Sequence, residues 1–147
     1  MSRALLDTSV LFAATYRRDS AHDDALPILK GVDDGSLPEA VVLDYVLAET
    51  LNGLGTHAGH DAAIDLLDRV EENARFHVES LSADAFANGK SLFRRHASLS
   101  LVDACILAYA HHNDRKYLYA LDDDFDLDGD VSRLATATNP YDPNTTR

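Results

Sequence analysis

Short apolar runs alternate with longer segments of helical character along this chain. The runs expected to form strands are residues 3–7, 40–43, 76–81, 117–121 and, as a last edge strand, 131–138. Strands separated by helices form parallel sheets whose two faces are both covered by helices. The alternation therefore predicts an α/β fold built on a central parallel sheet.

The segments between these runs have the three- and four-residue hydrophobic spacing of amphipathic helices. The expected helices cover residues 9–16, 22–32, 44–54, 61–72, 82–96 and 99–112. Ser9 and Asp44 are residue types that cap helices, so we expect them to begin the first and third of these. The third should bury a stripe made by Leu43, Leu47, Leu51 and Leu54. The fourth should turn Ile64, Leu66 and Leu67 inward.

The length of 147 residues is enough for one domain with a core of its own. We place that domain at residues 1–138, followed by an irregular tail at 139–147 that contains Pro140 and Pro143. No signal peptide is evident, and no apolar stretch approaches the roughly 20 residues that span a bilayer. We therefore expect a cytoplasmic protein without a membrane segment. Cys105 is the only cysteine, and its apolar surroundings predict a small buried side chain.

The formal net charge is −12, and Asp supplies 20 of the 25 acidic residues. A surface this acidic is typical of proteins from salt-loving archaea, because concentrated salt screens the self-repulsion. We favour this interpretation over an ordinary acidic cytosolic protein. The charge argues against non-specific nucleic-acid binding at low salt. It does not exclude a nucleic-acid enzyme, since at molar salt the Debye length is only about 3 Å.

Four acidic residues stand where an α/β fold would gather them. Asp7 and Asp122 each end an apolar run, while Glu49 and Asp103 lie near the starts of two helices. Ligands of parallel sheets bind outside the carboxyl ends of the strands. Crowded carboxylates repel one another, and a hard cation such as Mg²⁺ relieves that repulsion. Asp7 could instead cap a helix, and Glu49 could be a solvated side chain.

Asp103 has the sharpest sequence signal of the four. It is the only charge within residues 101–108, a segment that is apolar on all sides and should be buried. A buried carboxylate needs a partner or takes up a proton. Ser100 precedes it by three residues, so Asp103 could also belong to a capping box. The two interpretations are compatible, and we favour a role in a site.

Other possible metal sites are weaker. Residues 124–129 match the first half of an EF-hand loop, but the twelfth position is Ala135 instead of Glu, and a strand precedes the loop. His57, His60 and Asp61 have a spacing that suits a transition metal, yet an exposed loop explains them better. His111 and its neighbour are expected simply to end a helix.

Taken together, four segments resemble the PIN-domain ribonucleases, specifically the VapC-type toxins. The segments are residues 5–11, 47–52, 99–104 and 121–125. The resemblance implies a PIN-like three-layer α/β/α sandwich. It further implies that Asp7, Glu49 and Asp103 hold Mg²⁺ or Mn²⁺, that Asp122 is the fourth acid, and that Ser9 hydrogen-bonds within the cluster. Ala120 departs from the family's usual Thr or Ser, which leaves Asp124 as an alternative fourth acid.

The resemblance implies a Mg²⁺-dependent endoribonuclease that uses a metal-activated water and leaves a 5′-phosphate. It also implies an RNA substrate, an antitoxin partner and a homodimer. The alternative is a non-catalytic PIN-like module for RNA binding or assembly. An aspartyl phosphatase is disfavoured because Ser9 stands where a second Asp would be needed, and a phospho-receiver domain lacks its acceptor Asp and late Lys.

Overall fold

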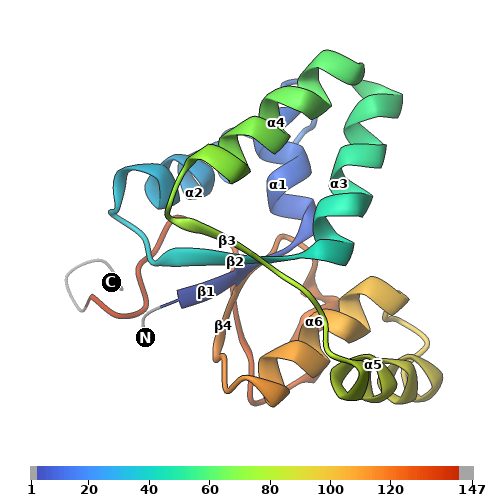
Figure 1. The fold of residues 1–147 in the computed structure, drawn as a ribbon. Helices are drawn as coiled ribbons and strands as arrows, with labels where there is room; N and C mark the ends of the chain where they lie inside the picture. Colours follow the sequence, from blue (N-terminus) through green and yellow to red (C-terminus); the bar gives the residue numbers. More distant parts are fainter. Residues whose placement is uncertain (1–2, 143–147) are drawn as a thin grey trace.

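The computed structural model describes residues 3–142 and contains a five-stranded sheet in the order β3-β2-β1-β4-β5 (Figure 1). The strands are β1 (Arg3–Leu6), β2 (Glu39–Leu43), β3 (Phe76–Glu79), β4 (Tyr117–Tyr119) and β5 (Ser132–Leu134). Every neighbouring pair is parallel. In the centre, Leu5 of β1 pairs with Val41 of β2 and with Leu118 of β4. The predicted parallel sheet is confirmed, including the edge strand at its end.

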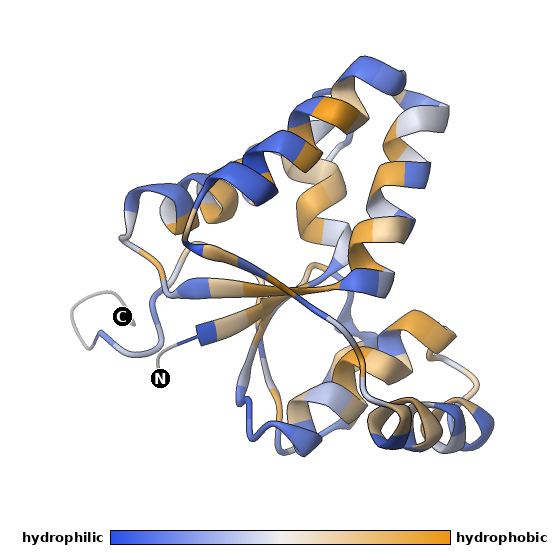
Figure 2. Ribbon diagram, viewed as in Figure 1, coloured by the Kyte–Doolittle hydropathy of each residue, from blue (hydrophilic) through white to orange (hydrophobic). Residues whose placement is uncertain are grey.

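Helices cover both faces of this sheet. They are α1 (Thr8–Thr15), α2 (His22–Asp34), α3 (Asp44–His57), α4 (His60–Glu72), α5 (Ala83–Arg95) and α6 (Leu101–His112). Helices α1 to α4 lie on one side of the sheet, and α5 and α6 lie on the other (Figure 1). Hydrophobic residues concentrate on the strands and on the helix faces turned toward them (Figure 2). The three-layer α/β/α sandwich is therefore confirmed.

All strands except β2 are shorter than the apolar runs that predicted them. β3 ends at Glu79 because Ser82 caps α5, where its hydroxyl accepts a hydrogen bond from the Ala85 backbone N–H. β4 ends at Tyr119, although the Ala120 N–H still bonds to the carbonyl of Leu134. The apolar residues that follow these two strand ends therefore lie outside the strands and pack against the core.

Two predicted helix caps are wrong. Asp7, not Ser9, is the N-cap of α1, and its carboxylate accepts the backbone N–H of Ser9. Leu43 is the N-cap of α3, and Asp44 is already the first helical residue, with its carboxylate bonded to the Tyr45 N–H. Both helices begin directly where a strand ends, so the last extended residue takes the cap position.

The buried face of α3 differs from the predicted leucine stripe. Val46, Thr50 and Leu54 are completely buried, whereas Leu47 and Leu51 are only half-buried against the core. Thr50 is tolerated there because its hydroxyl donates to the Val46 carbonyl at 2.7 Å. Leu43 and Leu54 are thus buried as predicted, while Val46 and Thr50 take the inward positions that were predicted for Leu47 and Leu51.

Helix α4 shows a similar difference. Leu66 is buried as predicted, together with Ala63 and Val70 at helical spacing. Ile64, however, is 38% exposed, which contradicts its predicted inward position. One residue corresponds to about 100° around a helix, so Ile64 cannot share the face that Ala63 and Leu66 bury.

Helices α5 and α6 pack closely at Gly89, directly against the buried Cys105. The burial of Cys105 was predicted. A Cβ atom on Gly89 would lie 2.9 Å from the Cys105 Sγ and 3.2 Å from its Cα. The close approach of the two helices therefore depends on glycine at this position.

We expect Gly89→Ala to lower the free energy of unfolding by roughly 1–3 kcal/mol relative to Gly55→Ala, because the new methyl overpacks the α5–α6 contact. Gly55 is a matched control, since it also lies within a helix and a Cβ there meets nothing within 4 Å. Urea unfolding of both variants measures the difference. Equal stabilities would show that the helices separate without cost.

The chain after β5 returns to the beginning of β1. The Tyr141 hydroxyl donates to the Arg3 carbonyl at 3.2 Å, and its ring packs edge-on against Tyr117. Residues 139–142 form turns, and the predicted tail beyond them lies outside the described residues. None of the helices within residues 3–142 is long and apolar enough to cross a membrane.

Candidate active site

Asp7 occupies the junction of β1 and α1 at the carboxyl end of the central strand. Its backbone N–H donates to the Tyr119 carbonyl at 3.0 Å, which holds it against β4. Asp7 as a whole is only 3% exposed. Its Oδ2 accepts the Ser9 hydroxyl at 2.6 Å, and its Oδ1 is buried without a hydrogen-bond partner among the described residues.

Burial raises the pKa of Asp7 above its usual range, and the negative charge of Glu49 raises it further. The hydrogen bonds from Ser9 and Thr8 act in the opposite direction. A buried carboxylate oxygen without a partner is costly unless a ligand or cation approaches it. Asp7 therefore has the features of a site residue in addition to its role as a helix cap.

Ser9 connects Asp7 to the neighbouring strand. Its hydroxyl donates to the Asp7 carboxylate and also accepts the backbone N–H of Leu121 at 3.1 Å. One small side chain thereby fixes the rotamer of Asp7 and the direction in which the chain leaves β4 toward Asp122.

We expect Ser9→Ala to lower the free energy of unfolding by roughly 1–3 kcal/mol, because the Leu121 N–H and the Asp7 Oδ2 both lose their partner. Ser9→Thr keeps the hydroxyl and is the matched control. Thermal unfolding measured on both variants checks this. Equal losses in the two would attribute the effect to steric change instead of the hydrogen bonds.

Glu49 lies in the second turn of α3, where its side chain is exposed but not simply solvated. The Thr8 hydroxyl donates to its Oε1 at 2.7 Å. This contact joins the beginning of α1 to α3 and directs the carboxylate toward the Asp7 end of the sheet. Apart from its place beside Asp7, no sequence pattern indicates this role for Thr8.

Asp103 lies in the first turn of α6, where Ser100 caps the helix by accepting the Asp103 backbone N–H at 3.1 Å. The predicted capping interaction is thus confirmed. The residue is half-buried, and this burial together with the charges of Asp7, Asp122 and Glu49 raises the pKa of its carboxyl to about 7. All four predicted acids therefore influence one another electrostatically at the same end of the molecule.

Asp122 caps the short 3₁₀ helix η1 (Asp123–Leu127), and its Oδ1 accepts the Asp124 N–H at 2.9 Å. Its side chain is exposed, and its charge raises the pKa of both Asp103 and Asp124. Carboxylate oxygens of residues 122–124 lie within 4.8 Å of one another. The η1 helix occupies the stretch that resembled an EF-hand and gives it a different conformation.

The four predicted acids do not form a closed set of ligands. Within residues 3–142, two groups of three side chains have all their ligand atoms within 4.8 Å, namely residues 122–124 and the group His111, Asp128 and Asp130. Asp7, Glu49 and Asp103 do not form such a triplet. Their oxygens lie farther apart than in a closed ligand set, although carboxylates gathered at one end of a sheet repel one another and attract a cation.

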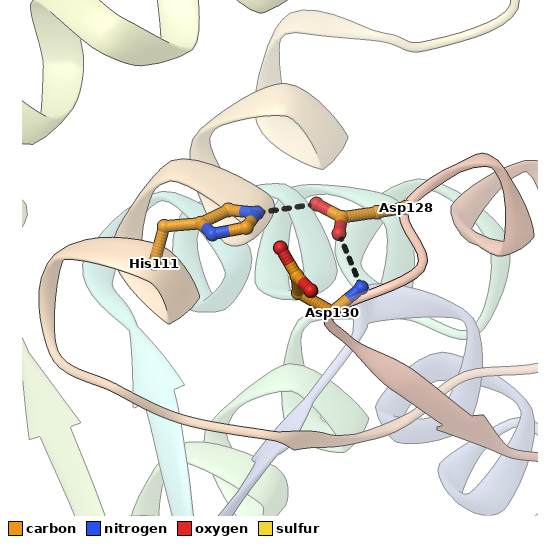
Figure 3. Close-up of side chains that lie close together, drawn as sticks. All are labelled: His111, Asp128 and Asp130. Carbon is orange, nitrogen blue, oxygen red and sulfur yellow. Dashed lines mark hydrogen bonds and ion pairs between the residues drawn. The ribbon is translucent and has the colours of Figure 1, made fainter.

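The second group lies at the C-terminal end of α6 and in the loop before β5 (Figure 3). His111 Nε2 lies 2.6 Å from Asp128 Oδ2, and the Asp130 N–H donates to Asp128 Oδ1 at 2.9 Å. His111 follows Asp103 by eight residues, or about 12 Å along the helix axis. We assign these contacts a structural role, because they tie the end of α6 to the loop before β5.

The histidines proposed as a weaker metal site are also apart from the acids. His57 ends α3 and His60 begins α4, so only residues 58–59 separate the helices. The His57 ring lies 5.9 Å from the Phe12 ring in an edge-on contact and 6.3 Å from Tyr16. The expected exposure of both histidines is confirmed, but they belong to helices instead of a loop.

The acidic cluster fits a divalent cation in its chemistry. Asp7 offers a buried oxygen with no hydrogen-bond partner among residues 3–142, and burial together with the charges of Asp7, Asp122 and Glu49 raises the pKa of Asp103 to about 7. The available donors are carboxylate oxygens, which suit Mg²⁺ or Mn²⁺ better than zinc.

A sequence profile of the PIN domain matches residues 4–127, and this range contains all four acids. The chain belongs to the PIN-domain family. The family identified by resemblance is therefore confirmed. No functionally curated protein matches the sequence significantly.

Several solved structures have a similar fold. VapC20 of Mycobacterium tuberculosis, a toxin that cleaves the sarcin–ricin loop, is 27% identical; the match covers 87% of this PIN domain chain and 96% of VapC20, with a TM-score of 0.76. VapBC2 of Rickettsia felis, bound to a promoter DNA fragment, is 15% identical over 90% and 97% of the chains, with a TM-score of 0.65. A Klebsiella pneumoniae toxin–antitoxin complex is 18% identical over 92% and 98%, with a TM-score of 0.59. The latter two similarities concern the fold alone.

Proposed function

We propose that this PIN domain is a Mg²⁺-dependent endoribonuclease and the toxin of a toxin–antitoxin pair. The observation that carries the proposal is the buried Asp7 carboxylate, whose Oδ1 has no hydrogen-bond partner among the described residues. The charge of Glu49 acts on Asp7, and the charges of Asp7, Asp122 and Glu49 act on Asp103. The sequence similarity to VapC20, which is itself an RNA-cleaving toxin, supports the choice of substrate.

Asp7, Glu49 and Asp103 would hold the cation, with Asp122 as the fourth acid, and Mn²⁺ would be able to replace Mg²⁺. When bound, the cation stabilises the charge that develops on the phosphate and makes a water molecule nucleophilic near neutral pH. Ser9 holds the Asp7 carboxylate in place, and Thr8 does the same for Glu49. Hydrolysis would leave a 5′-phosphate and a 3′-hydroxyl.

The proposed partners follow from the same comparison. The similarity to VapC20, which is a toxin, supports a cognate antitoxin that blocks the site, and we propose a homodimer as the working form. We also propose a cytoplasmic protein adapted to high salt, because the net charge of −12 is best tolerated when counter-ions screen it.

The decisive experiment is RNA cleavage with Mg²⁺, with Mn²⁺ and with EDTA, each at about 0.15 M and about 2 M KCl. The substrates are total cellular RNA and a synthetic sarcin–ricin stem-loop. We expect discrete products with 5′-phosphates in both metals and none in EDTA. Intact RNA under every condition would overturn the proposal and favour a non-catalytic RNA-binding or assembly module.

A further inference from the structure

One side of helix α5 carries alternating aromatic and basic residues. Phe86, Lys90, Phe93 and Arg94 follow one another at spacings that place them on the same side of a helix. Lys90 Nζ lies 4.9 Å from the centre of the Phe86 ring, and Phe93 is 47% exposed. We call these four residues the aromatic–basic stripe.

Tyr45 connects this stripe to the acidic site. Its ring meets Phe86 edge-on, with ring centres 5.6 Å apart and planes at 87°, and the residue is 39% exposed. Tyr45 precedes Glu49 by four residues, so both side chains lie on the same face of α3. The aromatic pair therefore bridges α3 and α5 directly beside one of the four acids.

Helix α5 also packs against the helix that carries Asp103. Cys105 of α6 contacts α5 at Gly89, and it follows Asp103 by two residues. The stripe thus begins at the acidic end of the molecule and runs outward along α5.

The charge on α5 is opposite to that of the chain as a whole. The helix contains three bases, Lys90, Arg94 and Arg95, against the single acid Asp84, while the chain has a net charge of −12. Phosphates are attracted to such a cluster. Exposed rings beside it offer stacking surfaces, which only unpaired bases can reach.

We propose that the aromatic–basic stripe and Tyr45 bind the unpaired nucleotides next to the phosphodiester that is cleaved. Bases would stack on Tyr45 and Phe93, and phosphates would contact Lys90 and Arg94. This inference rests on the proposed function and specifies its substrate as RNA that is single-stranded at the site. Charge complementarity favours RNA over a protein as the occupant of this surface.

The stacking part is tested by fluorescence anisotropy with labelled U₁₂ and A₁₂ RNA, each alone and annealed to its complement. The protein carries Asp7→Asn to prevent cleavage, and Mg²⁺ is present. We expect Tyr45→Leu and Phe93→Leu each to weaken binding of the single strands roughly 5- to 100-fold, with little effect on the duplexes. Tyr141→Leu is the matched control, because Tyr141 is a similarly exposed tyrosine (44%) in an edge-on aromatic pair away from the site.

The phosphate part is tested by the salt dependence of binding. Lys90→Gln should weaken the binding of every single strand equally and reduce the slope of log K against log [KCl] by about one. Lys30→Gln, at an exposed lysine on α2, should leave the slope unchanged. Equal slopes for the two variants would overturn the assignment of Lys90.

The cleavage kinetics separate this inference from the proposed function. In wild-type background, Tyr45→Leu should raise KM with little change in kcat, and its melting temperature should match that of Tyr141→Leu. RNA cleavage with unchanged KM in the Tyr45 and Phe93 variants would overturn the stripe and leave the proposed function standing. The stripe would also be overturned if the Tyr45 and Phe93 variants bound RNA normally but failed to form a dimer or an antitoxin complex. That result would show that the surface binds protein. Absence of cleavage by the wild type would overturn the function itself.

Discussion

Asp7→Asn should reduce RNA cleavage by roughly 10³-fold or more while the fold is retained. Asparagine has nearly the same shape, and its side-chain oxygen can still accept the hydrogen bonds from Ser9. What is lost is the negative charge at the buried Oδ1, which has no other partner in the described part of the chain. Initial cleavage rates in Mg²⁺ measure the effect, and circular dichroism measures the fold.

The control for this variant is Asp68→Asn on the exposed face of α4, which should cleave like the wild type. The Asp7 variant should also unfold at a temperature equal to or higher than that of the metal-free wild type, because burying a neutral amide costs less than burying a carboxylate. Retained cleavage with an intact fold would remove Asp7 from the site. It would also remove the main support for a metal-dependent mechanism.

The sheet was predictable because strands buried on both faces need continuous apolar residues. Residues 40–43 illustrate this, since each of them is at most 1% exposed. The rotation of the helices was less predictable. Whether Ile64 or Val70 faces inward depends on where α4 meets its neighbours, and both positions satisfy the same hydrophobic spacing.

The positions of the acids were predictable to different degrees. Asp7 and Asp122 follow strands, so the topology of a parallel sheet places them at one edge. Glu49 is exposed on a helix, and its pattern alone favoured a solvated residue; the contact with Thr8 joins residues 41 positions apart. The contact between Ser9 and Leu121 spans 112 positions. Such contacts arise from the packing of separate elements, which no local pattern contains.

The pKa of Asp103, about 7, makes the stability of the metal-free protein depend on pH. In the unfolded chain this carboxyl has an ordinary pKa near 4. Between about pH 4 and pH 7 the folded state therefore holds a proton that the unfolded state has released. The contribution of Asp103 to stability is greatest below this range and decreases as the pH rises through it, and the decrease is complete above about pH 7.

Asp103→Asn should remove this dependence. In EDTA the variant should match the wild type near pH 4 and exceed its free energy of unfolding by roughly 1–3 kcal/mol at pH 8, less than the full pKa difference implies because solvent reaches the half-buried side chain. Addition of Mg²⁺ or Mn²⁺ at pH 8 should reverse the order, since a cation that binds only the folded wild type stabilises it.

Urea unfolding at pH 4, 6 and 8, with EDTA and with Mn²⁺, tests both parts of this prediction, and the same variant should lose RNA cleavage. Mn²⁺ affinity of the wild type should fall below about pH 7 by up to tenfold per pH unit, because the cation must displace the proton on Asp103. A difference in stability between the wild type and Asp103→Asn that is the same at pH 4 and pH 8 in EDTA would show that Asp103 holds no extra proton in the folded state. A variant that Mn²⁺ stabilises as much as the wild type would place the cation elsewhere.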